Sequence, residues 1–399
     1  MLSSKRPRAL AMSAVALGIS ALVALPSSTP ASATGSIRFL GQVPSKRLYD
    51  VGVHSSVSNA ALAAASAGTT IAHFSAKVID GTSTFTYTMV GKKPSRATTN
   101  GLTTVKTLLV PIVIKFSNGH TWDPTVRDGC GSGASPFTRV KTSPIFVSQP
   151  WTWGGTSIGT SQLSGAIQRA EFWKYAQPTG INPTYGVRLA LKTVAPVTLN
   201  VPDASATEWG PGPCVNPGMV AGVDIQWLDP YLQSTVMPSL VSQGLTASTL
   251  PIFLLHNVFE YNTTPSNCCI GGYHGAYSPT AGVLQTYVVA NYEEDPVTVP
   301  QDSDIASLSH EVGEWLNDPY GNNPTKPWGH IGQVPGCQSN LEVGDPLSGT
   351  GFTDTVGGFT YHPQELAFFS WFYHQSPSLG VNGWYSDQGS FTTSAAACT

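Results

Sequence analysis

The sequence predicts an α+β or α/β protein with a mixed sheet, because segments with strand periodicity intermix along the chain with segments of helical periodicity. Two long apolar runs, 105–116 and 250–261, each predict a buried strand. Between them, residues 161–176 repeat apolar side chains at helical spacing and predict a helix. The chain is long enough for one large domain or two modest ones.

The other elements are expected on the same grounds. The sequence STFTYTMV at 83–90 indicates a strand, and the polar, turn-rich segment 91–104 indicates a linker after it. A turn is expected at 117–119, where Ser-Asn-Gly follows the first apolar run. The remaining elements are strands at 185–201 and 284–292 and a proline-interrupted helix at 223–244.

The N-terminus has the pattern of a secretory signal peptide. Lys5, Arg6 and Arg8 precede an apolar run at 9–25, and the small residues Ala-Ser-Ala at 31–33 favour cleavage after position 33. A membrane anchor is the weaker interpretation, because the run is shorter than the roughly 20 residues of a spanning helix and contains serine. We therefore expect a secreted, extracellular protein without membrane attachment after signal removal.

We expect a monomer. Its chain is expected to have three parts. Residues 1–33 are the signal peptide, 34–103 an N-terminal module or pro-segment with its linker, and 104–399 the main domain. Six cysteines in an exported chain favour disulfides. Cys268 and Cys269 are adjacent, and we expect each to bond a distant partner rather than its neighbour.

Charge is distributed unevenly between the two halves of the mature chain. Residues 34–192 contain 16 Lys/Arg and 5 Asp/Glu, whereas residues 193–399 contain 1 and 18. This asymmetry indicates that the halves dock on each other or that the acidic half binds cations. The basic half has no dense cluster, so a nucleic-acid partner is not expected.

The segment SLSHEVGEWLNDPYG at 307–321 contains the most informative motif. On a helix capped by Asp302 or Ser303, His310, Glu314 and Asp318 fall at i, i+4 and i+8 on one face. No Lys or Arg balances the acids, which indicates a cation. The other interpretation is a surface helix with its polar face in water.

Gly313 lies in the middle of this predicted helix. Glycine there costs about 1 kcal/mol relative to alanine, so we expect another part of the chain to pack close to it.

The sequence HEVGEWLNDPY resembles the active-site helix of thermolysin-type gluzincins, in which H-E-x-x-H is followed by an aspartate at the offset of Asp318. The resemblance implies that His310 is the first metal ligand and Glu311 the general base. It also implies that Glu342, in NLEVGDP, is the third ligand and that Asp345 orients the histidine. The sequence departs from the family at the second ligand position.

Glu314 occupies the position of the family's second histidine. We expect it to be a metal ligand, since zinc accepts carboxylate oxygen as well as imidazole nitrogen. A carboxylate there makes the site harder, so other divalent ions compete better with zinc.

The resemblance implies a zincin-like mixed sheet, with the strand at 284–292 holding an extended polypeptide beside the active-site helix. The expected activity is peptide hydrolysis through a metal-bound water, and an acidic cleft favours substrates with Lys or Arg near the scissile bond. A non-catalytic exported binding protein with a degenerate zincin-like fold is the alternative. A glycoside hydrolase with paired carboxylates is the third reading, and Trp315, Trp328 and Trp371 would suit sugar stacking.

The histidine in CCIGGYHGAY has two interpretations. His274, near Tyr277, is most simply a loop histidine bonded to backbone. The pair could instead contact substrate or an oxyanion, or His274 could complete the metal shell.

Overall fold

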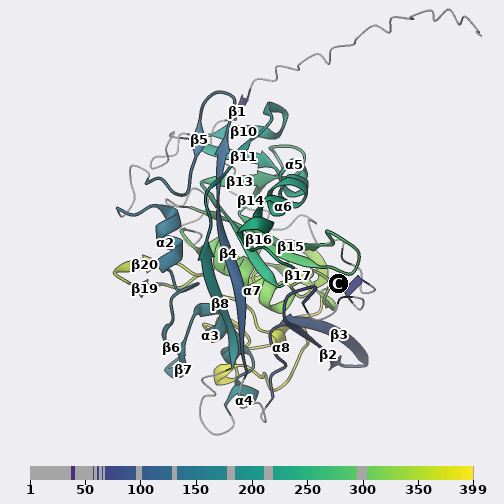
Figure 1. The fold of residues 1–399 in the computed structure, drawn as a ribbon. Helices are drawn as coiled ribbons and strands as arrows, with labels where there is room; N and C mark the ends of the chain where they lie inside the picture. The colour runs from purple at the N-terminus through teal and green to yellow at the C-terminus, as the bar shows by residue number, and fades with distance from the viewer. Residues whose placement is uncertain are drawn as a thin grey trace, which may run out of the picture. The chain divides into compact units, whose positions relative to one another are not determined.

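The computed structural model describes residues 37–40, 57, 61–62, 65, 68–95, 101–127, 133–177, 185–210, 219–293 and 303–398. The predicted signal peptide, 1–33, lies outside these residues. The described residues belong to one compact unit in which helices and strands intermix along the chain (Figure 1). The α+β class is therefore confirmed.

The strands are β1 (Arg38–Phe39), β2 (His73–Asp80), β3 (Ser83–Val90), β4 (Leu102–Lys115), β5 (Thr121–Trp122), β6 (Gln149–Trp153), β7 (Thr156–Ser161), β8 (Gly186–Thr193), β9 (Val197–Asn200), β10 (Ala206–Trp209), β11 (Val220–Asp224), β12 (Thr249–His256), β13 (Val258–Tyr261), β14 (Cys268–Ile270), β15 (Gly272–Tyr277), β16 (Gln285–Tyr292), β17 (Pro324–Ile331), β18 (Val334–Asn340), β19 (Asp354–Val356) and β20 (Phe359–Tyr361). The α-helices are α2 (Pro136–Thr142), α3 (Leu163–Glu171), α4 (Trp173–Ala176), α5 (Ile225–Tyr231), α6 (Met237–Leu240), α7 (Ala306–Asn317) and α8 (Phe369–Phe372). Short 3-10 or π segments are η1 (Asp203–Ser205), η2 (Leu232–Val236), η3 (Val241–Gln243), η5 (Asp345–Leu347) and η6 (Val381–Gly383).

The main sheet has the order β15-β16-β12-β4, and β8 and then β9 pair with successive parts of β4. These pairs are parallel, except that β15 is antiparallel to β16 at the edge of the sheet. The strand predicted at 105–116 is thus β4, which lies inside the sheet and is apolar because both its faces are covered. The short strand β5 also pairs with β4 after the predicted turn.

The run at 250–261 is two strands, so the prediction of a single strand there is wrong. β12 lies in the main sheet, whereas β13 belongs to a second sheet with the order β1-β10-β11-β13-β14. Asn257 separates them with a positive φ of 53°, and its N–H donates to the carbonyl of Tyr292. A left-handed residue redirects the chain, so the apolar run continues into another sheet.

Two other predicted elements are also divided. The predicted helix at 161–176 breaks at Phe172 into α3 and α4. The predicted strand at 185–201 is two strands, β8 and β9, which pair with the first and the last part of β4. The predicted helix at 223–244 is helical across Pro230, as α5, η2, α6 and η3.

Disulfides link Cys337 to Cys398 and Cys268 to its neighbour Cys269. The expectation that Cys268 and Cys269 bond distant partners is therefore wrong. Cys130 and Cys214 lie outside the described residues.

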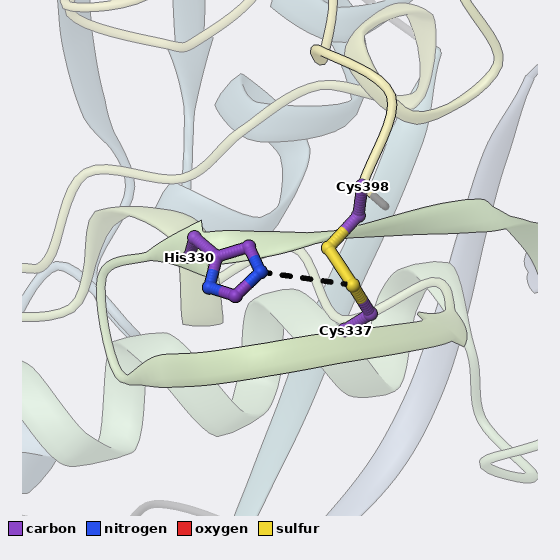
Figure 2. Close-up of side chains that lie close together, drawn as sticks. All are labelled: His330, Cys337 and Cys398. Atoms are coloured by element: carbon purple, nitrogen blue, oxygen red, sulfur yellow. Dashed lines mark hydrogen bonds between the residues drawn. A yellow bond between two sulfur atoms is a disulfide. The ribbon is translucent and has the colours of Figure 1, made fainter.

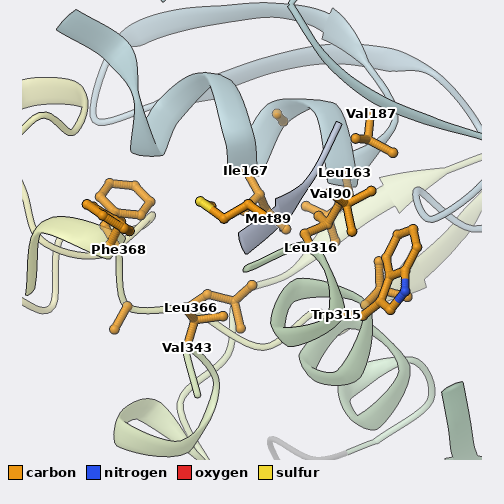
Figure 3. Close-up of a cluster of buried hydrophobic side chains, with 14 of the residues drawn as sticks. Met89, Val90, Leu163, Ile167, Val187, Trp315, Leu316, Val343, Leu366 and Phe368 are labelled. Carbon is orange, nitrogen blue, oxygen red and sulfur yellow. The ribbon is translucent and has the colours of Figure 1, made fainter. Parts of the chain in front are cut away.

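Helix α7 packs against β15 and β16 and is buried on every side. Its apolar residues Trp315 and Leu316 join a core with α3, β3 and the segment that contains Leu366 (Figure 3). An ideal Cβ on Gly313 would lie 2.2 Å from Leu366 Cδ1, which confirms the expected close packing. The polar face is also buried, so the surface-helix interpretation is wrong.

The start of α7 differs from the predicted cap. The N-cap position is Ile305, without a side-chain cap, and Asp302 lies outside the described residues. Ser303 contributes only its backbone carbonyl, which accepts from the N–H of Ala306.

Strands β2 and β3 form a hairpin that belongs to the same compact unit as the main sheet. Asn323 joins the hairpin to the end of α7. Its Nδ2 donates to the carbonyls of Thr88 and Asn317, and its Oδ1 accepts from the N–H of Thr88. The described part of the predicted N-terminal module is thus bonded to the motif helix. Removal of this module as a pro-segment stays a prediction.

Within the described ranges, none of the helices has the length and apolar character needed to cross a bilayer.

Candidate metal centre

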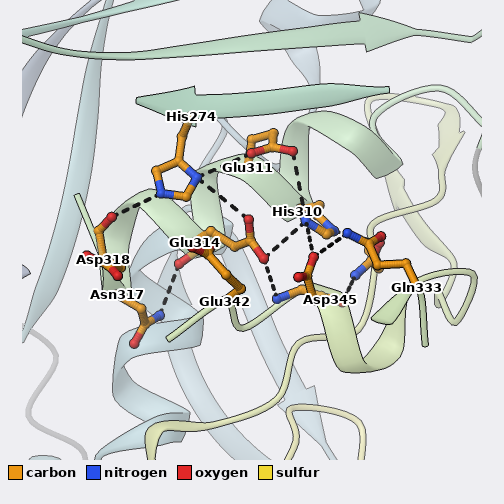
Figure 4. A network of polar contacts seen from close by, with 12 residues as sticks. His274, His310, Glu311, Glu314, Asn317, Asp318, Gln333, Glu342 and Asp345 are labelled. Atoms are coloured by element: carbon orange, nitrogen blue, oxygen red, sulfur yellow. Dashed lines mark hydrogen bonds and ion pairs between the residues drawn. The ribbon is translucent and has the colours of Figure 1, made fainter. Parts of the chain in front are cut away.

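The candidate centre is built from three parts of the chain that meet beside β15 (Figure 4). Helix α7 contributes His310, Glu311 and Glu314, with His310 and Glu314 one turn apart. Strand β15 contributes His274, and the segment 342–345 after β18 contributes two further carboxylates.

Glu314 contacts both histidines. Its Oε1 lies 3.1 Å from His310 Nε2, and its Oε2 lies 3.6 Å from His274 Nδ1. The backbone N–H of Gly344 donates to Oε1 over 3.0 Å and holds the carboxylate in this orientation. Glu314 therefore links α7, β15 and the segment that follows β18.

Hydrogen bonds determine which nitrogen of His310 faces the carboxylates. Nδ1 donates to Gln364 Oε1 over 3.0 Å, and Gln364 Nε2 donates to the carbonyl of Gly344 over 2.7 Å. The lone pair of a neutral ring is then on Nε2, which faces Glu314 and lies 3.7 Å from Asp345 Oδ1. An ideal Cβ on Gly344 would lie 2.4 Å from Nδ1, so the ring fits only because residue 344 is glycine.

His274 has the equivalent arrangement. Its Nε2 donates to the carbonyl of Asp318 over 3.0 Å, so the lone pair of a neutral ring is on Nδ1. Nδ1 lies 3.4 Å from Glu311 Oε2 and 3.6 Å from Glu314 Oε2. Both histidines therefore donate from one nitrogen and direct the other to shared carboxylates, as metal-binding histidines do.

The donor atoms form two overlapping groups. One contains His310, Glu314 and Asp345, the other contains His274, Glu314 and Glu342, and the atoms of each group lie within 4.8 Å of one another. The structure thus brings the three predicted ligands into one centre, with Glu314 common to both groups. Glu342 lies with His274 rather than with His310.

Amide side chains orient the two carboxylates that follow β18. Asn340 Nδ2 donates to Glu342 Oε1 over 3.0 Å. Gln338 Nε2 donates to Asp345 Oδ2 over 2.8 Å, and Gln333 Nε2 donates to Asp345 Oδ1. Each carboxylate thus accepts a hydrogen bond from a neutral amide side chain.

Burial and charge act in opposite directions on the pKa values of the histidines. Burial lowers the pKa of His310, but the negative charges of Glu314 and Glu311 outweigh it and raise the pKa to about 10. For His274, burial likewise lowers the pKa, and hydrogen bonds to Glu311 and Glu314 raise it well above its usual value. The carboxylates that raise the pKa values of both histidines would also stabilise a bound cation.

The two glutamates of α7 differ in pKa. For Glu314, burial raises the pKa, but the positive charge of His310 and the hydrogen bond to His274 outweigh burial and lower it. For Glu311, burial raises the pKa despite the opposing charge of His310. Glu314 is therefore the better anionic ligand, and Glu311 is the better proton acceptor at neutral pH.

Asp318 and Tyr277 have other contacts. The Asp318 carboxylate accepts from the N–H groups of Asn322 and Asn323 over 2.9 and 2.8 Å, so it closes the turn after α7, and only its carbonyl reaches His274. Tyr277 is three residues after His274 on β15 and therefore points to the opposite face of the strand. There it packs against a second hydrophobic core, which includes Tyr287. The structure does not bring Tyr277 to the centre.

Several neutral residues that shape the centre are not identifiable from the sequence. Gln364 and Gln333 orient His310 and Asp345, and Gly344 makes room for the ring. Gly272 similarly makes room for Glu311, because an ideal Cβ there would lie 2.9 Å from Glu311 Cγ. None of these residues has a spacing that identifies it in the sequence.

His330, Cys337 and Cys398 form a third close group (Figure 2). His330 Nε2 lies 3.9 Å from Cys337 Sγ, but that sulfur is bonded to Cys398. The sulfurs are therefore not thiolate ligands, and this group is a disulfide beside an exposed histidine.

Access to the centre is restricted. His310, Glu311 and Glu314 are 1, 2 and 3% exposed. Two cavities of about 680 and 640 Å³ flank the β2–β3 hairpin and are lined by other residues. The tryptophans considered for sugar stacking, Trp315, Trp328 and Trp371, are buried in the core and offer no free ring face.

Comparisons of the chain with family models, with curated proteins and with solved structures find no match.

Proposed function

We propose that the centre formed by α7, β15 and residues 342–345 binds a divalent cation, and that the protein is an exported, zincin-like metal-dependent peptidase. One observation carries the cation site. His310 and His274 each donate from one nitrogen to a protein acceptor and direct the other nitrogen toward Glu314. Metal-binding histidines have this orientation, because a hydrogen bond from one nitrogen fixes the ring and leaves the other nitrogen for the metal.

The donor set fits zinc and also harder ions. Two imidazoles and three carboxylates supply nitrogen and oxygen donors, which suit Zn²⁺, Mn²⁺ or Fe²⁺. We assign His310, His274 and Glu314 as the central ligands. Glu342 and Asp345 would complete the set from opposite sides.

A bound cation would supply a Lewis acid that polarises a carbonyl and acidifies water. Glu311 would then accept a proton, because its raised pKa makes it a stronger base than an ordinary glutamate. The expected substrate is a polypeptide, with Lys or Arg near the scissile bond favoured by the surrounding carboxylates.

A structural, non-catalytic cation is the second candidate, and the burial of the centre favours it. A peptide must reach Glu311, whose side chain is 2% exposed. A cation that only stabilises the fold requires no such access. The two candidates share the same ligands and differ in the role of Glu311.

Metal content tests whether the centre binds a cation, which both candidate functions require. Protein stripped with chelator and dialysed against Zn²⁺ should contain about one ion per chain by mass spectrometry of metals. Glu314→Gln should lose the ion, whereas Glu260→Gln, at an equally buried carboxyl outside the ligand set, should retain it. Equal metal content in the two variants would refute the assignment of Glu314.

Glu314→His tests the ligand position from the other direction. The change rebuilds H-E-x-x-H on a helix where residues 310 and 314 already point together, so zinc affinity should rise. Unchanged zinc affinity would contradict the assignment.

Activity separates the two candidates. A peptide library containing basic residues should be cleaved by the zinc-loaded protein, and Glu311→Gln should keep zinc but lose cleavage. Zinc binding without cleavage of any library member would leave the structural cation as the function of the site.

A further inference from the structure

A cavity of about 640 Å³ lies beside β2, β3 and α8. Aromatic rings of Tyr87, Phe172, Tyr175 and Phe369 form one part of its lining, and Lys77 and Lys93 form another. The volume is within the usual range of small-molecule sites. The combination of aromatic and cationic side chains determines which ligands are compatible with it.

The two lysines supply positive charge without a competing ion pair. Both are exposed, and neither makes an ion pair within the described part of the chain. Asp80, on the same strand as Lys77, bonds Lys326 Nζ over 2.9 Å and His374 Nδ1 over 2.8 Å instead. An anion that enters the cavity would therefore meet two available ammonium groups.

The acid behind the aromatic rings does not cancel this charge. Glu171 is buried, and the N–H of Phe369, one of the lining residues, donates to its Oε1 over 2.6 Å. Burial raises the pKa of Glu171 to about 8, opposed by that hydrogen bond, so the carboxyl is mainly neutral at pH 7. The electrostatic field in the cavity is then set by the lysines.

The aromatic residues provide an apolar surface next to the charges. Phe172, Phe369 and Tyr87 line the cavity and are largely buried, whereas Tyr175 is 36% exposed. Contact with apolar groups on these rings is favourable because it removes aromatic surface from water.

We propose that this cavity binds an amphipathic anion, with an apolar body against Tyr87, Tyr175 and Phe369 and a carboxylate between Lys77 and Lys93. The apolar body can be aliphatic or aromatic, and the test includes one ligand of each kind. This site is separate from the metal centre and does not depend on the proposed peptidase activity.

The test uses full-length mature protein and isothermal titration at pH 7 and low salt. Decanoate and N-acetylphenylalanine are the anionic probes. Decanol and decyltrimethylammonium are the matched neutral and cationic probes. At least one anionic probe should bind, and added salt should weaken its binding. If decanoate binds, it should bind more tightly than decanol and decyltrimethylammonium.

Variants locate the binding. Lys77→Gln combined with Lys93→Gln should weaken the bound anion by about tenfold. Lys115→Gln, at an exposed lysine of β4 outside this cavity, is the matched control and should leave affinity unchanged. Tyr175→Ala should weaken the same probe through loss of apolar contact, with metal content unaffected.

Three outcomes would overturn the proposal. These are no binding of either anion by wild type, an anion affinity that added salt leaves unchanged, and equal affinity in the double-lysine variant and the Lys115 control.

Discussion

Glu314→Gln should destabilise the chelator-treated protein strongly at neutral pH. The substitution keeps the shape of the side chain but removes its negative charge. Glu314 faces His310 Nε2 at 3.1 Å and His274 Nδ1 at 3.6 Å, in a centre almost without solvent exposure. Removing one partner of a buried ion pair leaves the other charge uncompensated, which typically costs about 3–5 kcal/mol.

The pKa of His310 gives an independent magnitude. A rise from 6.5 to about 10 corresponds to about 4 kcal/mol of stability at pH 7. Because the folded-state pKa is raised, this stability is complete below pH 6.5 and is lost as pH rises through 10. Glu311 also contributes to the shift, so we expect Glu314→Gln to lower the free energy of unfolding by about 3 kcal/mol.

Urea unfolding followed by tryptophan fluorescence, at pH 7 with excess chelator, measures this difference. Glu260→Gln is the matched control, because Glu260 is 0% exposed and burial raises its pKa well above the usual value. Burial disfavours a negative charge on Glu260, so replacing it by an amide of the same shape should change stability by less than about 1 kcal/mol. Equal losses in the two variants would refute the charge argument. Wild type should also lose stability between pH 6.5 and 10, and Glu314→Gln should lose less.

Three further predictions concern the rest of the fold. Gly313→Ala should lower the free energy of unfolding by about 1–2 kcal/mol, because overpacking against Leu366 exceeds the gain in helix propensity, and adding Leu366→Val should reduce the loss in urea unfolding. Glu171→Gln should raise the free energy of unfolding at pH 7 by up to about 3 kcal/mol. The folded-state pKa of Glu171 is raised to about 8, so wild type loses stability as the pH rises from 4.5 to 8, and the variant should not. Parallel pH profiles of the two proteins would contradict this. Cys337→Ser with Cys398→Ser should cost about 4 kcal/mol, given their separation of 61 residues, and an unchanged thermal midpoint would count against it.

The local sequence pattern was sufficient to predict those strands whose own residues are apolar enough to require burial. The strands at 83–90 and 284–292 are β3 and β16, because a run of apolar and β-branched side chains is stable only when paired and covered. The spacing of His310 and Glu314 likewise predicted their contact, since residues four apart on a helix are neighbours. The cost of a mid-helix glycine predicted close packing at Gly313.

Tertiary structure alone decided how these elements meet. His274 is 37 residues from Glu311 and Gln364 is 54 residues from His310, and their contacts depend on the position of β15 at the sheet edge and on the path of the chain after α7. Periodicity reports which face of an element is apolar, but it does not specify which distant element covers the other face. From the sequence, the polar face of α7 was therefore compatible with a solvated surface as well as with the favoured cation site. In the folded chain it is buried, because β15 and the segment 342–345 supply it with hydrogen-bonding and charged partners.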